Sequence, residues 1–361
     1  MEELAVGRPH ERAARGNAPA RSNTSGELSA ARAELRKLFL ANVLDVKHQV
    51  GAQLQHLDEL TAVFSSFGDE RSLGRAAYLR ANVYWDSFRL AAAESALGEA
   101  LDHARKSESH HDAQRALESL TAVFLLGPHP VDDAIERCKE ILVESDEPLS
   151  RSKCLLRLGT LYAMKEDFDT ARAHVEEGRS ILLDLGHRHA VAASTHESGM
   201  VEVLAGRHQE AEREFRDGIE TLEIIGDGAT LASSAAHLAR VLYSRGQLED
   251  ALHWTEASEA AWGDHPYGIV EWGPTRAKIQ ARFGHTEVAE HLARAALQTI
   301  QMSDDILARA DTAIGLAEVY ILGGRYIAAT PLLEEAVGLY SSKGVVPFER
   351  QTRRLLAATA A

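Results

Sequence analysis

Residues 155–178 read LLRLGTLYAMKEDFDTARAHVEEG. The first half predicts a helix with leucines and Tyr162 on one face and Gly159 between them, because residues three or four apart share a face. The second half predicts another helix, whose inner face carries Ala171 and Val175. Small residues at Gly159 and Ala171 let two helices approach closely, whereas larger ones would push them apart. The stretch therefore predicts one antiparallel helix pair.

The same two small positions recur along the chain in steps of 37 to 41 residues. The first position is always Ala or Gly: Ala41, Ala81, Ala122, Gly159, Gly199, Ala239, Ala277 and Ala317. Twelve residues further on come Gln53, Ala93, Ala134, Ala171, Ala211, Ala251, Ala289 and Ala329. Eight such units predict an all-α, right-handed superhelix of near sixteen helices, in which each unit packs only against its neighbours.

The array is expected to begin soon after the N-terminus and to run to the end of the chain. Residues 1–25 are rich in Arg, Ala, Ser, Pro, Asn and Gly, which predicts a flexible tail. From residue 26 to residue 361 the helical pattern is nearly continuous and has no long linker, so a single domain is expected. A final capping helix is expected at about residues 348–359.

Composition narrows the possible partners. The chain has 39 Lys and Arg against 54 Asp and Glu, and its net charge of -15 disfavours general nucleic-acid binding. No apolar run approaches the length of a membrane span and no signal-peptide core begins the chain, so we expect a cytoplasmic protein without membrane association. The two cysteines, Cys138 and Cys154, are expected to be buried, reduced neighbours.

No motif predicts catalysis or a bound cofactor. The sequence has no G-x-x-x-x-G-K-[ST] phosphate loop and no nucleophile motif with a plausible base. The histidine-rich segments 110–112 and 187–189 fall in predicted loops, and neither supplies the three or four convergent ligands that a metal site needs. We therefore expect no enzyme activity, no cofactor and no metal site.

The repeat resembles a known family. Leu158-Gly159-x-x-Tyr162, followed by Ala171 and Val175, is similar to the tetratricopeptide repeat (TPR), although the period is near 40 residues instead of 34. Segments such as those at 204–214, 239–246, 276–284 and 316–319 resemble the C-terminal repeat region of bacterial regulators that carry cyclase and AAA-type ATPase domains. MalT-like transcription activators have a related layout. The resemblance implies a scaffold or sensor region without inherited catalysis.

The resemblance also implies a binding face. In TPR-like arrays the first helix of each pair lines a concave groove, so fixed offsets from the first small position predict groove residues. Aromatic, Met and Arg side chains often anchor binding surfaces. The predicted partner-binding residues are Tyr78, Asn82, Trp85, His196, Met200, Arg240, Tyr243, Trp272, Lys278 and Arg282. The alternative for any single aromatic residue, such as Trp85 or Trp272, is that it packs between repeats.

These features favour a non-catalytic scaffold or regulatory module that binds a protein or peptide in its groove. The alternative is a sensor for a small molecule or signalling peptide near His196, Arg240 and Trp272, which regulates transcription or a nucleotide cyclase. Peptide recognition through asparagines has little support, because the groove offers chiefly Asn42 and Asn82. The identity of the partner and the oligomeric state are left open by the sequence.

Overall fold

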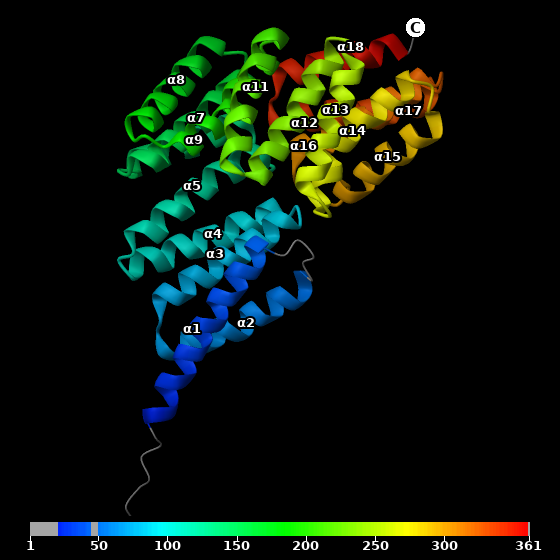
Figure 1. The fold of residues 1–361 in the computed structure, drawn as a ribbon. Helices are drawn as coiled ribbons and strands as arrows, with labels where there is room; N and C mark the ends of the chain where they lie inside the picture. The colour runs from blue at the N-terminus through cyan, green and yellow to red at the C-terminus, as the bar shows by residue number, and fades with distance from the viewer. Residues whose placement is uncertain (1–20, 45–49, 360–361) are drawn as a thin grey trace, which may run out of the picture.

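A computed structural model describes residues 21–44 and 50–359, and all regular structure in this part of the chain is α-helical (Figure 1). The first four helix pairs are α1 (Arg21–Leu44) with α2 (Val50–Phe67), α3 (Glu70–Asp86) with α4 (Leu90–Lys106), α5 (His110–Leu126) with α6 (Val131–Glu144), and α7 (Pro148–Met164) with α8 (Phe168–Asp184). The last four are α10 (Thr195–Leu204) with α11 (His208–Ile225), α12 (Gly228–Ser244) with α13 (Leu248–Trp262), α14 (Pro266–Arg282) with α15 (Thr286–Ile300), and α16 (Ile306–Leu322) with α17 (Tyr326–Lys343). The short α9 (Arg188–Ala193) precedes α10, and α18 (Val346–Thr359) ends the described chain.

This arrangement confirms the predicted fold of eight helix pairs followed by a capping helix. Helices α9 and α10 together take the place of one first helix, which is broken at Ser194. Helix α1 already begins at Arg21, within the segment expected to be a tail, while residues 1–20 lie outside the described residues. None of the described helices is long and apolar enough to cross a bilayer.

The recurring small residues lie where neighbouring helices touch. At the second position, every alanine from Ala93 to Ala329 is at most 1% exposed. At the first position, a Cβ atom on Gly159 would lie 2.6 Å from Cγ2 of Val175 and 2.9 Å from the carbonyl oxygen of Ala171. Close approach of the paired helices therefore explains why small residues recur at these two positions, as the sequence predicted.

Two of the assigned first positions need correction. In α3, α7, α12, α14 and α16 the small residue lies eleven residues after the helix begins, and in α5 that position is Thr121. Thr121 is 1% exposed, whereas Ala122 is only half-buried, so the predicted register was one residue late in this unit. Ala41 is exposed, so it does not form a helix contact of this kind.

The expectation that each unit packs only against its neighbours was wrong. The chain turns from the blue N-terminal helices through green to the orange and red C-terminal ones (Figure 1), and loops of the late repeats reach the early ones. Both carboxylate oxygens of Asp304 accept backbone N–H bonds at the start of α4, from Leu90 at 2.5 Å and from Ala91 at 2.8 Å. The ammonium group of Lys343 donates to the carbonyl oxygen of Phe124 at 2.8 Å.

We call this set of contacts the closure. It comprises Ser303, Asp304 and Lys343 of the late repeats, together with the end of α3, the start of α4 and the end of α5, which they contact. The apolar core is continuous across it, because Tyr340 of α17 belongs to the same buried cluster as Phe124 of α5. A small rotation between successive repeats accumulates along a solenoid, which brings units that are distant in sequence together.

Candidate functional site

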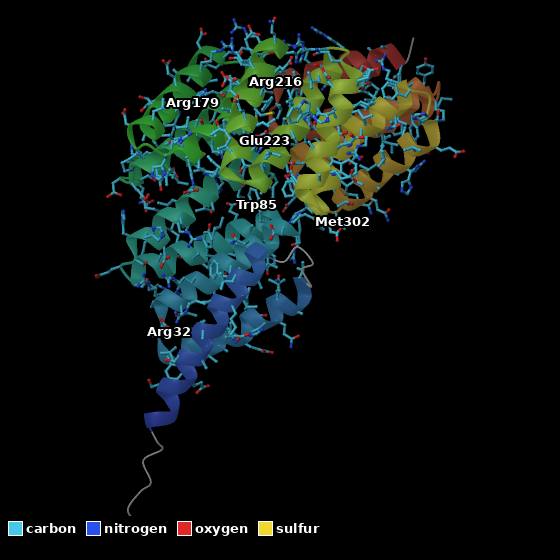
Figure 2. The ribbon with its side chains drawn as sticks, viewed as in Figure 1. Arg32, Trp85, Arg179, Arg216, Glu223 and Met302 are labelled. Carbon is cyan, nitrogen blue, oxygen red and sulfur yellow. The ribbon has the colours of Figure 1, made fainter. Side chains whose placement is uncertain are left out.

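The curved array surrounds a cavity of about 940 Å³. Its walls come mainly from the first helices of the pairs, namely α3, α5, α7, α10, α12, α14 and α16. Figure 2 shows Trp85, one of the lining residues, where the cyan helices face the green ones. The first helices thus line the inner face, as the resemblance implied.

Half of the predicted binding residues line this cavity. They are Asn82, Trp85, His196, Met200 and Arg240. Tyr78 instead shares a 3.0 Å hydrogen bond with the hydroxyl of Ser119, and its ring lies under the guanidinium of Arg115. Trp272 is 6% exposed, and its ring lies 4.1 Å from the guanidinium of Arg276 on the same helix.

The remaining three predicted residues form a separate cluster outside the cavity walls. The ammonium of Lys278 lies 4.7 Å from the ring centre of Tyr243 and 3.4 Å from a carboxylate oxygen of Glu318. The guanidinium of Arg282 lies 6.0 Å from the same ring. The hydroxyl of Tyr243 donates to Glu318 at 3.3 Å, so this carboxylate contacts both Lys278 and Tyr243.

Each cation of the cavity wall already has a carboxylate partner. Lys153 pairs with Glu118, and Arg157 pairs with Glu197. Arg240 pairs with Asp311 at 2.5 Å, and the hydroxyl of Tyr340 donates to the other oxygen of Asp311. These pairs join different repeats across the inner face, so they stabilise the curvature of the wall.

Glu271 is a half-buried carboxylate of the wall whose hydrogen-bond donors are neutral. Its two oxygens accept hydrogen bonds from the hydroxyl of Ser233 and the indole N–H of Trp262, each at 3.0 Å. No Lys or Arg among the described residues forms an ion pair with it. Burial raises the pKa of Glu271 to about 7, against the opposing effect of these two hydrogen bonds and of Arg240.

Asp305 is also buried, but its charge is met by a helix end. Its carboxylate accepts the backbone N–H of Ala308 at 2.9 Å and caps α16, where the helix dipole is positive. Burial nevertheless raises the pKa of Asp305 to about 6. Asp305 therefore has a structural partner, whereas Glu271 has only neutral donors.

Two histidines meet edge to face on the wall. The ring centres of His196 and His237 lie 4.7 Å apart, and His237 also stacks on Phe215 at 5.8 Å. Burial lowers the pKa of both histidines, and lowers that of His237 the further. Both rings are therefore neutral at pH 7 and can act as hydrogen-bonding groups there.

The described residues contain no group of three His, Cys, Asp or Glu side chains that could hold a metal ion. His189, from one histidine-rich segment, instead lies 2.6 Å from the carboxylate of Asp227. Cys138 and Cys154 are both buried and neighbouring, as expected, because the thiol of Cys154 donates to the carbonyl oxygen of Cys138 at 3.1 Å. The arrangement can bind a ligand by shape, hydrogen bonds and charge.

Sequence reasoning missed a row of wall residues one turn earlier than the offsets it used. Ser233, Glu271 and Asp311 each lie six residues before the first small position of their own helix. Residues at offsets of three and six or seven share a helix face, so this row continues the predicted one. Trp262 and Tyr267 were missed for a different reason, since they lie at the end of α13 and at the start of α14, far from the offsets used.

Sequence comparison supports the repeat assignment. The tetratricopeptide repeat family matches residues 231–257, which lie on α12 and α13. The fold is a TPR solenoid. No curated protein matches the sequence.

Two solved structures share the fold of this TPR chain over most of its length. One is a Rap protein in complex with Competence and Sporulation Factor, with a TM-score of 0.51, 11% identity, and coverage of 94% of this chain and 98% of that one. The other is the apo form of the quorum sensor NprR from B. thuringiensis, with a TM-score of 0.51, 13% identity, and coverage of 88% and 99%. At these identities the likeness is one of fold.

Proposed function

We propose that this TPR chain is a non-catalytic regulatory module that binds a signalling peptide in its central cavity. The observation that carries the proposal is the cavity of about 940 Å³, which the first helices of seven repeats line. Ligand pockets usually measure about 300–1,000 Å³, so this one lies at the upper end and suits a short peptide. Its wall combines Trp85, Met200 and neutral histidines with charged pairs, which suits a ligand of mixed character.

The fold comparison favours a sensor over a plain scaffold. The Rap structure contains a bound factor, and NprR is described as a quorum sensor. The two sequence-based hypotheses, a scaffold and a sensor, differ in what occupies the inner face. A cavity of about 940 Å³ suits a short peptide or small ligand better than a folded protein. This supports the sensor version.

The resemblance to cyclase–ATPase and MalT-like regulators suggests what ligand binding would control. A ligand that binds only one curvature of the superhelix shifts the chain toward that curvature. The altered outer surface then controls a protein partner in a cytoplasmic transcription or nucleotide-cyclase system. The binding half of the proposal can be tested without knowledge of that partner.

The test uses a matched pair of methionines. A randomised pool of short peptides is passed over the immobilised full chain, and retained peptides are identified by mass. Met200→Trp fills part of the cavity and should abolish retention, whereas Met302→Trp should not, because Met302 is 90% exposed in the loop after α15 (Figure 2). Retained peptides should also raise the melting temperature of the wild type. Equal retention by both variants, or no retained peptide at all, would contradict the proposal.

A further inference from the structure

The wall of the cavity carries an excess of negative charge. Three cations line it, Lys153, Arg157 and Arg240. Six carboxylates line it, Asp86, Glu118, Glu197, Glu271, Asp305 and Asp311. A concave surface of one sign concentrates ions of the opposite sign, because the surrounding protein focuses the field.

A wall carboxylate with no ion pair to a Lys or Arg of the described residues lies where α13 meets α14. The cations pair with Glu118, Glu197 and Asp311, and the N-terminus of α16 compensates Asp305. Within residues 21–44 and 50–359, Glu271 receives hydrogen bonds from the neutral hydroxyl of Ser233 and the indole N–H of Trp262 and from no Lys or Arg. A carboxylate has about four lone-pair positions, so two acceptor positions stay available on Glu271.

Aromatic rings surround this carboxylate. The ring centres of Trp262 and Tyr267 lie 5.6 Å apart, and that of His265 lies 5.2 Å from Trp262. All three residues line the cavity beside Glu271. Aromatic faces attract ammonium and guanidinium groups, most strongly where water is excluded.

We propose that Glu271, Trp262 and Tyr267 form a subsite for a protonated amine or guanidinium group, so that the cavity selects cationic ligands. The proposal rests on the proposed ligand-binding function and specifies the chemistry of the ligand. The cationic group can belong to a basic residue of a peptide or to a free polyamine. An anionic group is disfavoured, because each wall cation already has a carboxylate partner.

The protonation behaviour of Glu271 agrees with this subsite. Burial without a cationic partner raises its pKa to about 7, and a bound cation would lower it again. At pH 7 about half of the free chains hold a proton on Glu271, and a cationic ligand should displace that proton. Calorimetric titration in two buffers of different ionisation enthalpy measures this release directly and needs no variant.

The main experiment compares three pools of short, end-blocked peptides that differ only in one fixed residue, which is Arg, its neutral isostere citrulline, or Glu. The full chain should retain Arg peptides about tenfold more strongly than citrulline peptides, as expected for one charged hydrogen bond. Glu271→Gln should remove this preference. Glu223→Gln should keep it, because Glu223 is an exposed residue of α11 (Figure 2).

A spermidine titration distinguishes the two sources of the cation. Binding of spermidine that Glu271→Gln removes, with no peptide retained from any pool, would support the subsite and contradict the peptide-binding function. Peptides retained without preference for Arg over citrulline, or with an equal preference in Glu271→Gln, would overturn the subsite and leave peptide binding standing. If Glu271→Gln fails to fold, the wild-type proton measurement decides: binding of Arg peptide without proton release at pH 7 overturns the subsite.

Discussion

The ammonium nitrogen of Lys343 lies 2.7 Å from the carbonyl oxygen of Gly127, although 216 residues separate them in the sequence. Lys343 is fully buried, and burial lowers its pKa to about 8. Its two carbonyl partners lie at the C-terminal end of α5, where the helix dipole favours a cation. The contact ties the last helix pair to the third one, and so it helps to set the curvature around the cavity.

Removal of the Asp304 carboxylate should weaken the closure. Asp304→Ala deletes both hydrogen bonds to the start of α4, and loss of such a cap costs about 1 kcal/mol. We expect a lower free energy of unfolding in urea and a larger radius of gyration by solution X-ray scattering. Asp217→Ala, on the exposed face of α11, is the control and should change neither. An unchanged radius in Asp304→Ala would show that the closure does not hold the curvature.

The glycines at the small positions of the repeat should not tolerate an added methyl group. A Cβ atom on Gly199 would lie 2.6 Å from the ring of Phe215, so Gly199→Ala should destabilise the fold by about 1–3 kcal/mol. Gly98 lies inside α4 with open space around it, so Gly98→Ala should stabilise the fold by about 0.5–1 kcal/mol. Chemical denaturation of the two variants measures both changes. A loss of stability in both would mean that helix propensity and helix spacing are not the deciding factors.

The charge of Glu271 should make the fold less stable at alkaline pH. Its pKa is raised from 4.5 to about 7 by burial, so the folded chain keeps a proton that the unfolded chain releases. The stabilisation is complete below pH 4.5 and is lost as pH rises through 7, by at most roughly 3 kcal/mol. The charged groups that act on it are Arg240 of α12 and Asp305 before α16. The difference in unfolding free energy between wild type and Glu271→Gln, measured from pH 5 to pH 8, should follow this course; a constant difference would contradict it.

The paired histidines should have the opposite effect in acid. Burial lowers the pKa of His196 and His237. Below the ordinary pKa of 6.5, the unfolded chain therefore binds more protons at these residues than the folded chain does. Stability should therefore fall as pH drops below 6.5. Glu197, Arg157 and Arg240 also act on these rings. Replacement of both histidines by asparagine should flatten this part of the pH profile of thermal unfolding, and an equally steep profile would assign the effect to other groups.

Several features of the site followed from the repeat period together with the resemblance to TPR arrays. The offsets from the small positions placed Asn82, Trp85, His196, Met200 and Arg240 on the inner face, because first helices with the same register present the same face. They failed for Trp272, which packs against Arg276 within its own helix, and for Glu271, which lies one turn beyond the offsets used. Periodicity assigns a residue to a face, but it does not give the distance to the opposite wall.

The helix pairs, their number and their inner faces could be predicted from the amino-acid pattern, because each depends on contacts between residues fewer than about forty positions apart. The three-dimensional fold was needed to show that the array closes on itself, that Lys343 meets Gly127, and that no Lys or Arg of the described residues pairs with Glu271. These contacts depend on curvature, which is the sum of small rotations between successive repeats. This curvature cannot be read from any short stretch of sequence, yet the curvature determines which distant side chains share the cavity.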